Sequence, residues 1–129
     1  MVNFLLVALA GALGAVSRWG LSRGLAQWLG TQFPYGTLLA NLLGCFLLGL
    51  IMHIGLNTDK IAPSLRLAVT VGFLGALTTF STFSYETVAL LQDGNWTKAG
   101  WNILANLILG LGATLAGFAL GRTFTEGIS

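Results

Sequence analysis

The most constraining feature of this chain is an uncharged apolar segment whose centre is crowded with hydroxyl side chains. No charged residue occurs from Leu67 to Tyr85, so we expect this segment to lie within a membrane-spanning helix. Its centre reads Gly72-Phe73-Leu74-Gly75-Ala76-Leu77-Thr78-Thr79-Phe80-Ser81-Thr82-Phe83-Ser84. Because successive helical residues are rotated by about 100°, these hydroxyl residues cannot all share one helix face. The segment therefore predicts a helix that is broken near its centre.

A break at this depth of a membrane has two interpretations. Irregular backbone is tolerated there when it is buried in protein or lines a water-filled cavity, and the free ends of interrupted helices commonly bind ions. Gly72 and Gly75 precede the hydroxyls, at positions where backbone distortion costs little. Alternatively, the hydroxyls bond to carbonyls of their own helix, and the segment packs against another helix. The pattern alone leaves both interpretations open.

The composition is that of an integral membrane protein. Of 129 residues, 55% are hydrophobic and 8% are charged, with a net charge of +2. The charges lie near the ends of apolar segments, so we expect no nucleic-acid partner. The single cysteine, Cys45, cannot form an internal disulfide, and we interpret it as a small buried residue. No nucleotide loop, metal-ligand cluster or nucleophile–base pair stands out, so we predict no enzyme activity.

Four apolar segments predict an all-α fold of four transmembrane helices, in a single domain that spans residues 1–129. The segments cover approximately residues 3–28, 35–54, 64–91 and 98–121, with both termini on one side of the membrane. In the first segment, the spacing of Gly20 and Gly24 favours close helix packing, and Gly11 and Gly14 add more small surface. Arg18 lies unusually deep in the same segment, where it either snorkels toward the interface or braces exposed carbonyls.

Polar residues in the second and fourth segments are aligned on single helix faces. Thr37 and Asn41 are one helical turn apart, and a carboxamide inside a span must find a partner. The column in the fourth segment consists of Asn102, Asn106, Gly110, Thr114, Gly117 and Gly121. This column predicts a helix–helix contact, and its polar end could extend an ion path.

The basic residues are balanced between the two sides of the predicted bundle. Lys60, Arg66 and Arg122 fall on the side of the termini, and Arg18, Arg23 and Lys98 fall on the other. Because membrane orientation follows this count, the balance predicts that chains insert in both directions. Four helices of this size can hardly enclose a pore alone, so we expect an oligomer. A mixed population would permit an antiparallel homodimer with its two-fold axis in the membrane plane.

The motif at residues 72–84 resembles the Fluc/CrcB family of fluoride channels. The resemblance covers the whole chain, including Gly14-Ala15 with Arg18, and Gly36-Thr37 with Asn41-Leu42-Leu43-Gly44. One departure is Ala76, where members of this family often have a second glycine.

The resemblance implies a passive channel that exports cytoplasmic fluoride across the bacterial inner membrane. It implies an antiparallel, dual-topology homodimer with two pores, and a structural sodium ion (Na+) held at the dimer centre by the main-chain carbonyls of Gly75 and Thr78. The fluoride pathway residues that it implies are Asn41, Phe80, Ser81, Thr82, Phe83, Ser84, Glu86 and Asn106. Arg18 and Thr79 would have structural roles.

The chemistry of these residues is compatible with rapid anion conduction. The ring edges of Phe80 and Phe83 carry partial positive charge, and hydroxyl or amide donors can replace lost water without holding the ion as tightly as a fixed cation would. Alternatively, the two rings are ordinary packing residues.

Two other functions remain to be distinguished from a fluoride channel. A small four-helix multidrug exporter would depend on a carboxylate in its first helix, where this chain has no Asp or Glu. A non-transporting assembly protein would explain the glycines but not the hydroxyl cluster.

Overall fold

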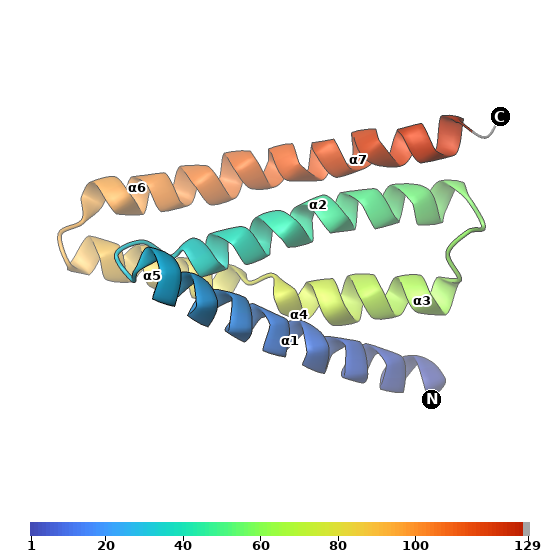
Figure 1. Ribbon diagram of the computed structural model, residues 1–129, viewed down its shortest axis with the longest axis horizontal. Coiled ribbons are helices and arrows are strands. Elements are labelled where there is room, and N and C mark those ends of the chain that lie inside the picture. The colour runs from blue at the N-terminus through green and yellow to red at the C-terminus, as the bar shows by residue number, and fades with distance from the viewer. Residues whose placement is uncertain (128–129) are drawn as a thin grey trace.

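Four long helical spans lie side by side in the computed structural model, which describes residues 1–127 (Figure 1). The first two spans are the continuous helices α1 (Val2–Leu29) and α2 (Tyr35–Asn57). The third consists of α3 (Pro63–Leu67), the π-helical segment η1 (Ala68–Leu74), α4 (Gly75–Leu77) and α5 (Phe80–Gln92). The fourth consists of α6 (Trp96–Leu104), the π-helical segment η2 (Ala105–Leu109) and α7 (Gly110–Glu126). The predicted all-α fold is confirmed for the described residues.

The lengths and surfaces of these spans make the chain a multi-pass membrane protein. Within residues 1–127, four spans are long and apolar enough to cross a membrane. At a rise of 1.5 Å per residue, α2 alone is about 35 Å long, which exceeds the roughly 30 Å hydrocarbon core of a bilayer. Large apolar side chains project outward, including Phe4 and Leu115, which are 83% and 68% exposed. The start of α1 and the end of α7 lie at the same end of the bundle, as predicted for the two termini (Figure 1).

Glycines allow the closest helix contacts. A Cβ atom added to Gly117 of α7 would overlap the Phe46 carbonyl of α2, and one added to Gly49 would overlap the Thr114 carbonyl. The column predicted in the fourth segment is therefore a helix–helix contact, with α7 packed along α2. Such close approach of backbones is how helices gain packing energy in lipid.

Of the small residues predicted to allow close packing of the first segment, Gly14 does so, whereas Gly20 and Gly24 make no close contact within the described part of this chain. Nothing among the described residues lies within 4 Å of a Cβ atom added to either glycine. The contact of α1 with the third span is made through Gly14, where an added Cβ would overlap the Phe73 carbonyl. Gly20 is six residues from Gly14, a rotation of about 240°, so it lies on a different helix face.

A cluster of buried apolar residues lies beside the break in the third span. Ala40, Leu74 and Leu77 form a buried cluster, against which Leu47 and Phe73 pack. The irregular backbone is thus supported by protein on its inner side, which satisfies the condition for irregular structure at membrane depth.

Candidate ion pathway

The third span is broken at two extended residues. Thr78 has φ −80° and ψ 154°, and Thr79 has φ −153° and ψ 119°, between the end of α4 and the start of α5. Thr79 caps α5, because its Oγ1 accepts a hydrogen bond of 3.1 Å from the Thr82 amide. The predicted break near Gly75–Thr78 is confirmed, with the extended backbone beginning at Thr78.

The Asn41 side chain of α2 bonds to the backbone exposed by this break. Its Oδ1 accepts a 2.8 Å hydrogen bond from the Thr79 amide, and its Nδ2 donates to the Thr79 carbonyl at 3.2 Å. In a continuous helix the Thr79 amide would donate to the Gly75 carbonyl. Asn41 therefore satisfies backbone groups that the break removes from the helical pattern.

Asn41 also begins a chain of side-chain hydrogen bonds, here called the amide relay, which consists of Asn41, Asn106, Asn102 and Thr87. Asn41 Nδ2 donates to Asn106 Oδ1 at 2.9 Å, and Asn106 Nδ2 donates to Asn102 Oδ1 at 3.0 Å. Asn102 Nδ2 donates to Thr87 Oγ1 at 2.9 Å, and Thr87 Oγ1 donates to the Phe83 carbonyl at 2.7 Å. The relay connects α2, the fourth span and α5.

Two members of this relay were not predicted as pathway residues. Asn102 was interpreted as part of a helix contact whose polar end could extend an ion path, but it was not assigned to the pathway, and Thr87 was not singled out. Asn102 and Thr87 are 0% and 5% exposed. The available signal was the one-turn spacing of Asn102 and Asn106, which places two carboxamides on one helix face.

The hydroxyl groups near the break have different partners. Thr78 Oγ1 donates to the Leu74 carbonyl at 3.0 Å, which is the self-bonding alternative considered for the cluster. Thr79 Oγ1 instead donates to Thr82 Oγ1 at 2.9 Å and lies 3.3 Å from Ser81 Oγ. Ser84 is half-buried and makes no side-chain hydrogen bond within residues 1–127.

Phe80 and Phe83 line a groove of about 450 Å³ beside the break. Their ring centroids are 5.6 Å apart and the rings are inclined at 51°. Asn41 and Asn106 line the same groove, so four of the predicted pathway residues are brought together. Phe80 is 79% exposed, which leaves the groove open on its outer side.

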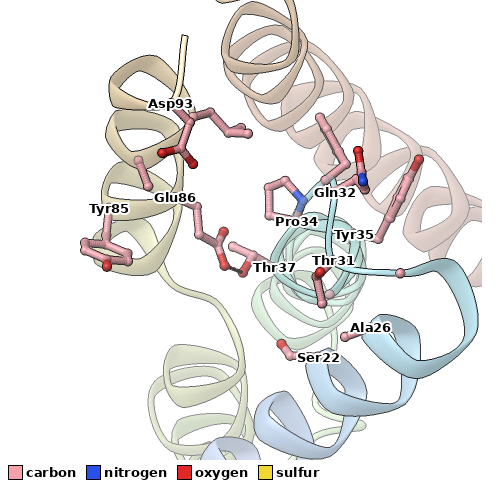
Figure 2. Close-up of a pocket in the computed structure, with 15 residues that line it drawn as sticks. Ser22, Ala26, Thr31, Gln32, Pro34, Tyr35, Thr37, Tyr85, Glu86 and Asp93 are labelled. Atoms are coloured by element: carbon pink, nitrogen blue, oxygen red, sulfur yellow. Dashed lines mark hydrogen bonds between the residues drawn. The ribbon is translucent and has the colours of Figure 1, made fainter. Parts of the chain in front are cut away.

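A second cavity, of about 380 Å³, lies at the end of the bundle opposite the termini. Figure 2 shows Glu86 of α5 pointing toward Thr37 of α2, and Thr37 Oγ1 donates to Glu86 Oε1 at 2.8 Å. The other carboxyl oxygen, Glu86 Oε2, is buried without a hydrogen-bond partner in the described chain. Since Thr37 and Asn41 are one turn apart on α2, this helix connects the cavity to the groove.

Arg18 and Gly75 are both less enclosed than the relay. Arg18 is half-buried and its side chain makes no hydrogen bond within residues 1–127, so its role as a brace for exposed carbonyls stays a prediction. Gly75 is exposed, and a Cβ atom added there would meet only the Thr70 carbonyl, at 3.7 Å.

These observations define a small integral membrane protein with four spans, the third of which is broken beside a groove lined by two aromatic rings. The chain belongs to the CrcB family: residues 5–118 match the family described as CrcB-like protein, Camphor Resistance (CrcB). The resemblance found in the sequence is thereby confirmed.

Curated relatives cover nearly the whole chain. It is 51% identical over 126 residues to a protein of Dehalococcoides mccartyi (strain CBDB1), which covers 98% of this chain and 97% of the relative. It is 47% identical over 122 residues to a protein of Geobacter metallireducens, and the matched region is 95% of this chain and 98% of the relative. It is 52% identical over 109 residues to a protein of Shewanella sp. (strain ANA-3), and the matched region is 84% of this chain and 87% of the relative. All three relatives are named Fluoride-specific ion channel FluC.

Proposed function

We propose that this chain forms a fluoride channel, not an enzyme, which lets fluoride leave the cytoplasm passively across the bacterial inner membrane. The observation that carries the proposal is the groove at the broken helix, where Phe80 and Phe83 lie beside Asn41. The names of relatives about half identical to this chain support fluoride as the ion.

The chemistry of the groove favours a weakly held anion. The groove is lined without a charged side chain, and the positive ring edges of Phe80 and Phe83 offer weak attraction to an anion. Hydroxyl and amide donors can replace the hydration shell one contact at a time. An ion bound this weakly can leave as readily as it enters, which rapid conduction requires.

Asn41 contacts fluoride in this proposal by exchanging one of its existing hydrogen bonds. Both hydrogens of its Nδ2 are used, toward the Thr79 carbonyl at 3.2 Å and Asn106 Oδ1 at 2.9 Å. The bond to Thr79 is longer and therefore weaker. We expect fluoride to compete for this hydrogen as it passes.

The path continues from the groove toward the second cavity. The hydroxyl residues of α5 and the Thr37–Glu86 pair would border this part of the path, with Asn106 on the side of the fourth span. The α5 residues assigned to the path are Phe80, Ser81, Thr82, Phe83, Ser84 and Glu86.

A second copy of the chain would complete the pathway as an antiparallel homodimer. The groove is open on its outer side and the ring of Phe80 is exposed, so a second copy of the chain would enclose both. The equal numbers of basic residues at the two ends of the bundle allow both orientations in one membrane. Two-fold symmetry would then give two equivalent pores.

A sodium ion at the dimer centre fits the carbonyls near the break. The Thr79 amide is engaged by Asn41, and the Thr78 hydroxyl donates to Leu74, so neither group satisfies the carbonyls of Gly75 or Thr78. Four such oxygens from two chains, with no carboxylate, suit a monovalent cation better than a divalent one. When bound, the ion would supply positive charge that fixes the crossing of the two chains.

Growth of a bacterium that lacks its own fluoride exporters tests this function in cells. We expect expression of the unmodified chain to restore growth in fluoride medium. An expressed, membrane-inserted protein that gives no fluoride resistance would contradict the proposal. Resistance to cationic drugs instead would favour the multidrug-exporter alternative.

A further inference from the structure

We propose that Thr87 and Asn102 are positioning residues, which set the orientation of the Asn41 amide at the groove. The inference rests on the proposed function, in which Asn41 lies on the fluoride path. Thr87 and Asn102 are buried and do not line the groove themselves. Their effect must therefore pass through the amide relay.

The direction of the relay is fixed at Thr87. A threonine hydroxyl has one hydrogen, and Thr87 gives it to the Phe83 carbonyl at 2.7 Å. The Thr87 oxygen can then only accept a hydrogen bond from Asn102. The atom of Asn102 that faces Thr87 must be Nδ2, which leaves Oδ1 facing Asn106.

The same logic carries this direction to Asn41. Asn106 must present Nδ2 to the Asn102 oxygen, and it also donates to the Asn102 main-chain carbonyl at 2.9 Å. Asn106 Oδ1 therefore faces Asn41, which must present Nδ2 in return. Each carboxamide has one donor side and one acceptor side, so an inverted amide at one step would disfavour every following bond.

The backbone at the break requires the same orientation of Asn41. The Thr79 amide needs an acceptor and the Thr79 carbonyl needs a donor, which match Oδ1 and Nδ2 of Asn41 respectively. The relay and the break therefore agree, and both favour one rotamer of one amide. Such agreement holds a donor at a defined place in the groove before an ion arrives.

Loss of the Thr87 hydroxyl would remove the group that sets this direction at the α5 end of the relay, while the Asn102 main-chain carbonyl and Thr79 would still favour it at the other steps. The Asn102 Nδ2 group would lose its acceptor in a site that is 0% exposed, where an unsatisfied donor is costly. If the Asn102 amide turned over, its nitrogen would face the Asn106 nitrogen, donor against donor. A turn of Asn106 to relieve this contact would cost its bonds to the Asn102 main-chain carbonyl and to Asn41, so we expect the carboxamides to shift and to move the Asn41 amide with them.

Substitution of Thr87 by Val or Ser tests this inference. Thr87→Val keeps the branched shape without the hydroxyl, whereas Thr87→Ser keeps the hydroxyl. We expect fluoride efflux from liposomes to be about tenfold slower for Thr87→Val, and close to the unmodified rate for Thr87→Ser, at equal amounts of folded dimer. Thr123→Val is a control, because Thr123 also bonds to its own helix, at the Leu120 carbonyl, but lies outside the relay.

A nuclear magnetic resonance measurement separates positioning from simple stabilisation. We expect the side-chain amide resonances of Asn41, assigned by their loss in Asn41→Asp, to move in Thr87→Val and not in Thr87→Ser or Thr123→Val. Unchanged efflux together with unmoved Asn41 resonances in Thr87→Val would overturn the inference, as would reduced efflux with unmoved resonances. If Thr87→Val does not fold, Thr87→Cys replaces it, since a thiol is a weak acceptor of similar size.

The efflux and resonance measurements also distinguish this inference from the proposed function. Absence of fluoride efflux from the unmodified protein would contradict the fluoride proposal. The amide resonances would still report whether Thr87 orients Asn41.

Discussion

Asn41 bonds to both main-chain groups of Thr79, accepting from its amide at 2.8 Å and donating to its carbonyl at 3.2 Å. One side chain of α2 thus holds the extended backbone between α4 and α5. This contact places Asn41 at the start of the amide relay and at the wall of the groove.

Asn41→Asp is expected to reduce fluoride conduction at least tenfold. The new carboxylate still accepts from the Thr79 amide, but it places negative charge against the Thr79 carbonyl and beside the path. Two like charges 4 Å apart repel by about 4 kcal/mol at an effective dielectric constant of 20, which is enough for this loss. Single-channel recording or vesicle efflux measures the effect.

Asn57→Asp is the matched control, because Asn57 is exposed at the far end of α2 and donates to the His53 carbonyl of its own helix. Normal conduction in a folded Asn41→Asp dimer would remove Asn41 from the path.

Replacement of Phe80 or Phe83 by Ile is expected to suppress fluoride flux while the protein stays folded. Ile keeps apolar bulk but lacks the ring quadrupole that attracts an anion to the ring edge. Flux should be measured per folded dimer, with Phe124→Ile as a control, because Phe124 lies near the end of α7 and does not line the groove. If both groove variants conduct normally, the two rings are packing residues.

Gly117→Ala is expected to destabilise the protein by about 1–3 kcal/mol, because the added methyl group overlaps the Phe46 carbonyl of α2. Gly112→Ala on the same helix is the matched control, since a Cβ atom added at Gly112 has nothing within 4 Å among the described residues. Its stability should change by about 1 kcal/mol or less. Thermal unfolding in detergent compares the two variants. Equal melting temperatures would argue against the packing of α7 on α2 described above.

Gly75→Val is expected to weaken the dimer without unfolding the single chain. Gly75 is exposed and meets only the Thr70 carbonyl at 3.7 Å, so the chain itself has room for a side chain. At a two-fold axis, the same side chain would separate the two sets of carbonyls and the sodium ion between them. Cross-linking measures dimer formation, and helix content by circular dichroism reports folding. A dimer of unchanged stability, which also loses no activity when sodium is removed, would contradict the proposed arrangement.

The sequence predicted the broken third span well because the cause is local. A run of hydroxyl residues that no single helix face can accommodate lies directly at the extended residues Thr78 and Thr79. The capping bond from Thr82 to Thr79 also lies within four residues of chain, so it depends little on the rest of the fold.

The amide relay could not be predicted in this way. Helical periodicity aligned Asn102 with Asn106, but it does not extend through two extended residues. The break resets the rotation of α5 relative to α3 and α4, so the position of Thr87 could not be counted from the preceding helix. Spacing alone likewise did not show which small residues of α1 face the rest of the chain: Gly14 contacts the third span, whereas an added Cβ atom at Gly20 or Gly24 has no neighbour within 4 Å among the described residues.

Fluoride efflux from liposomes that contain only the purified, unmodified protein tests the central claim most directly. A fluoride electrode should record rapid release from fluoride-loaded vesicles once charge balance is provided, and chloride release under the same conditions should be far slower. Fluoride release no faster than from protein-free vesicles, with the protein shown to be folded and inserted, would contradict the account.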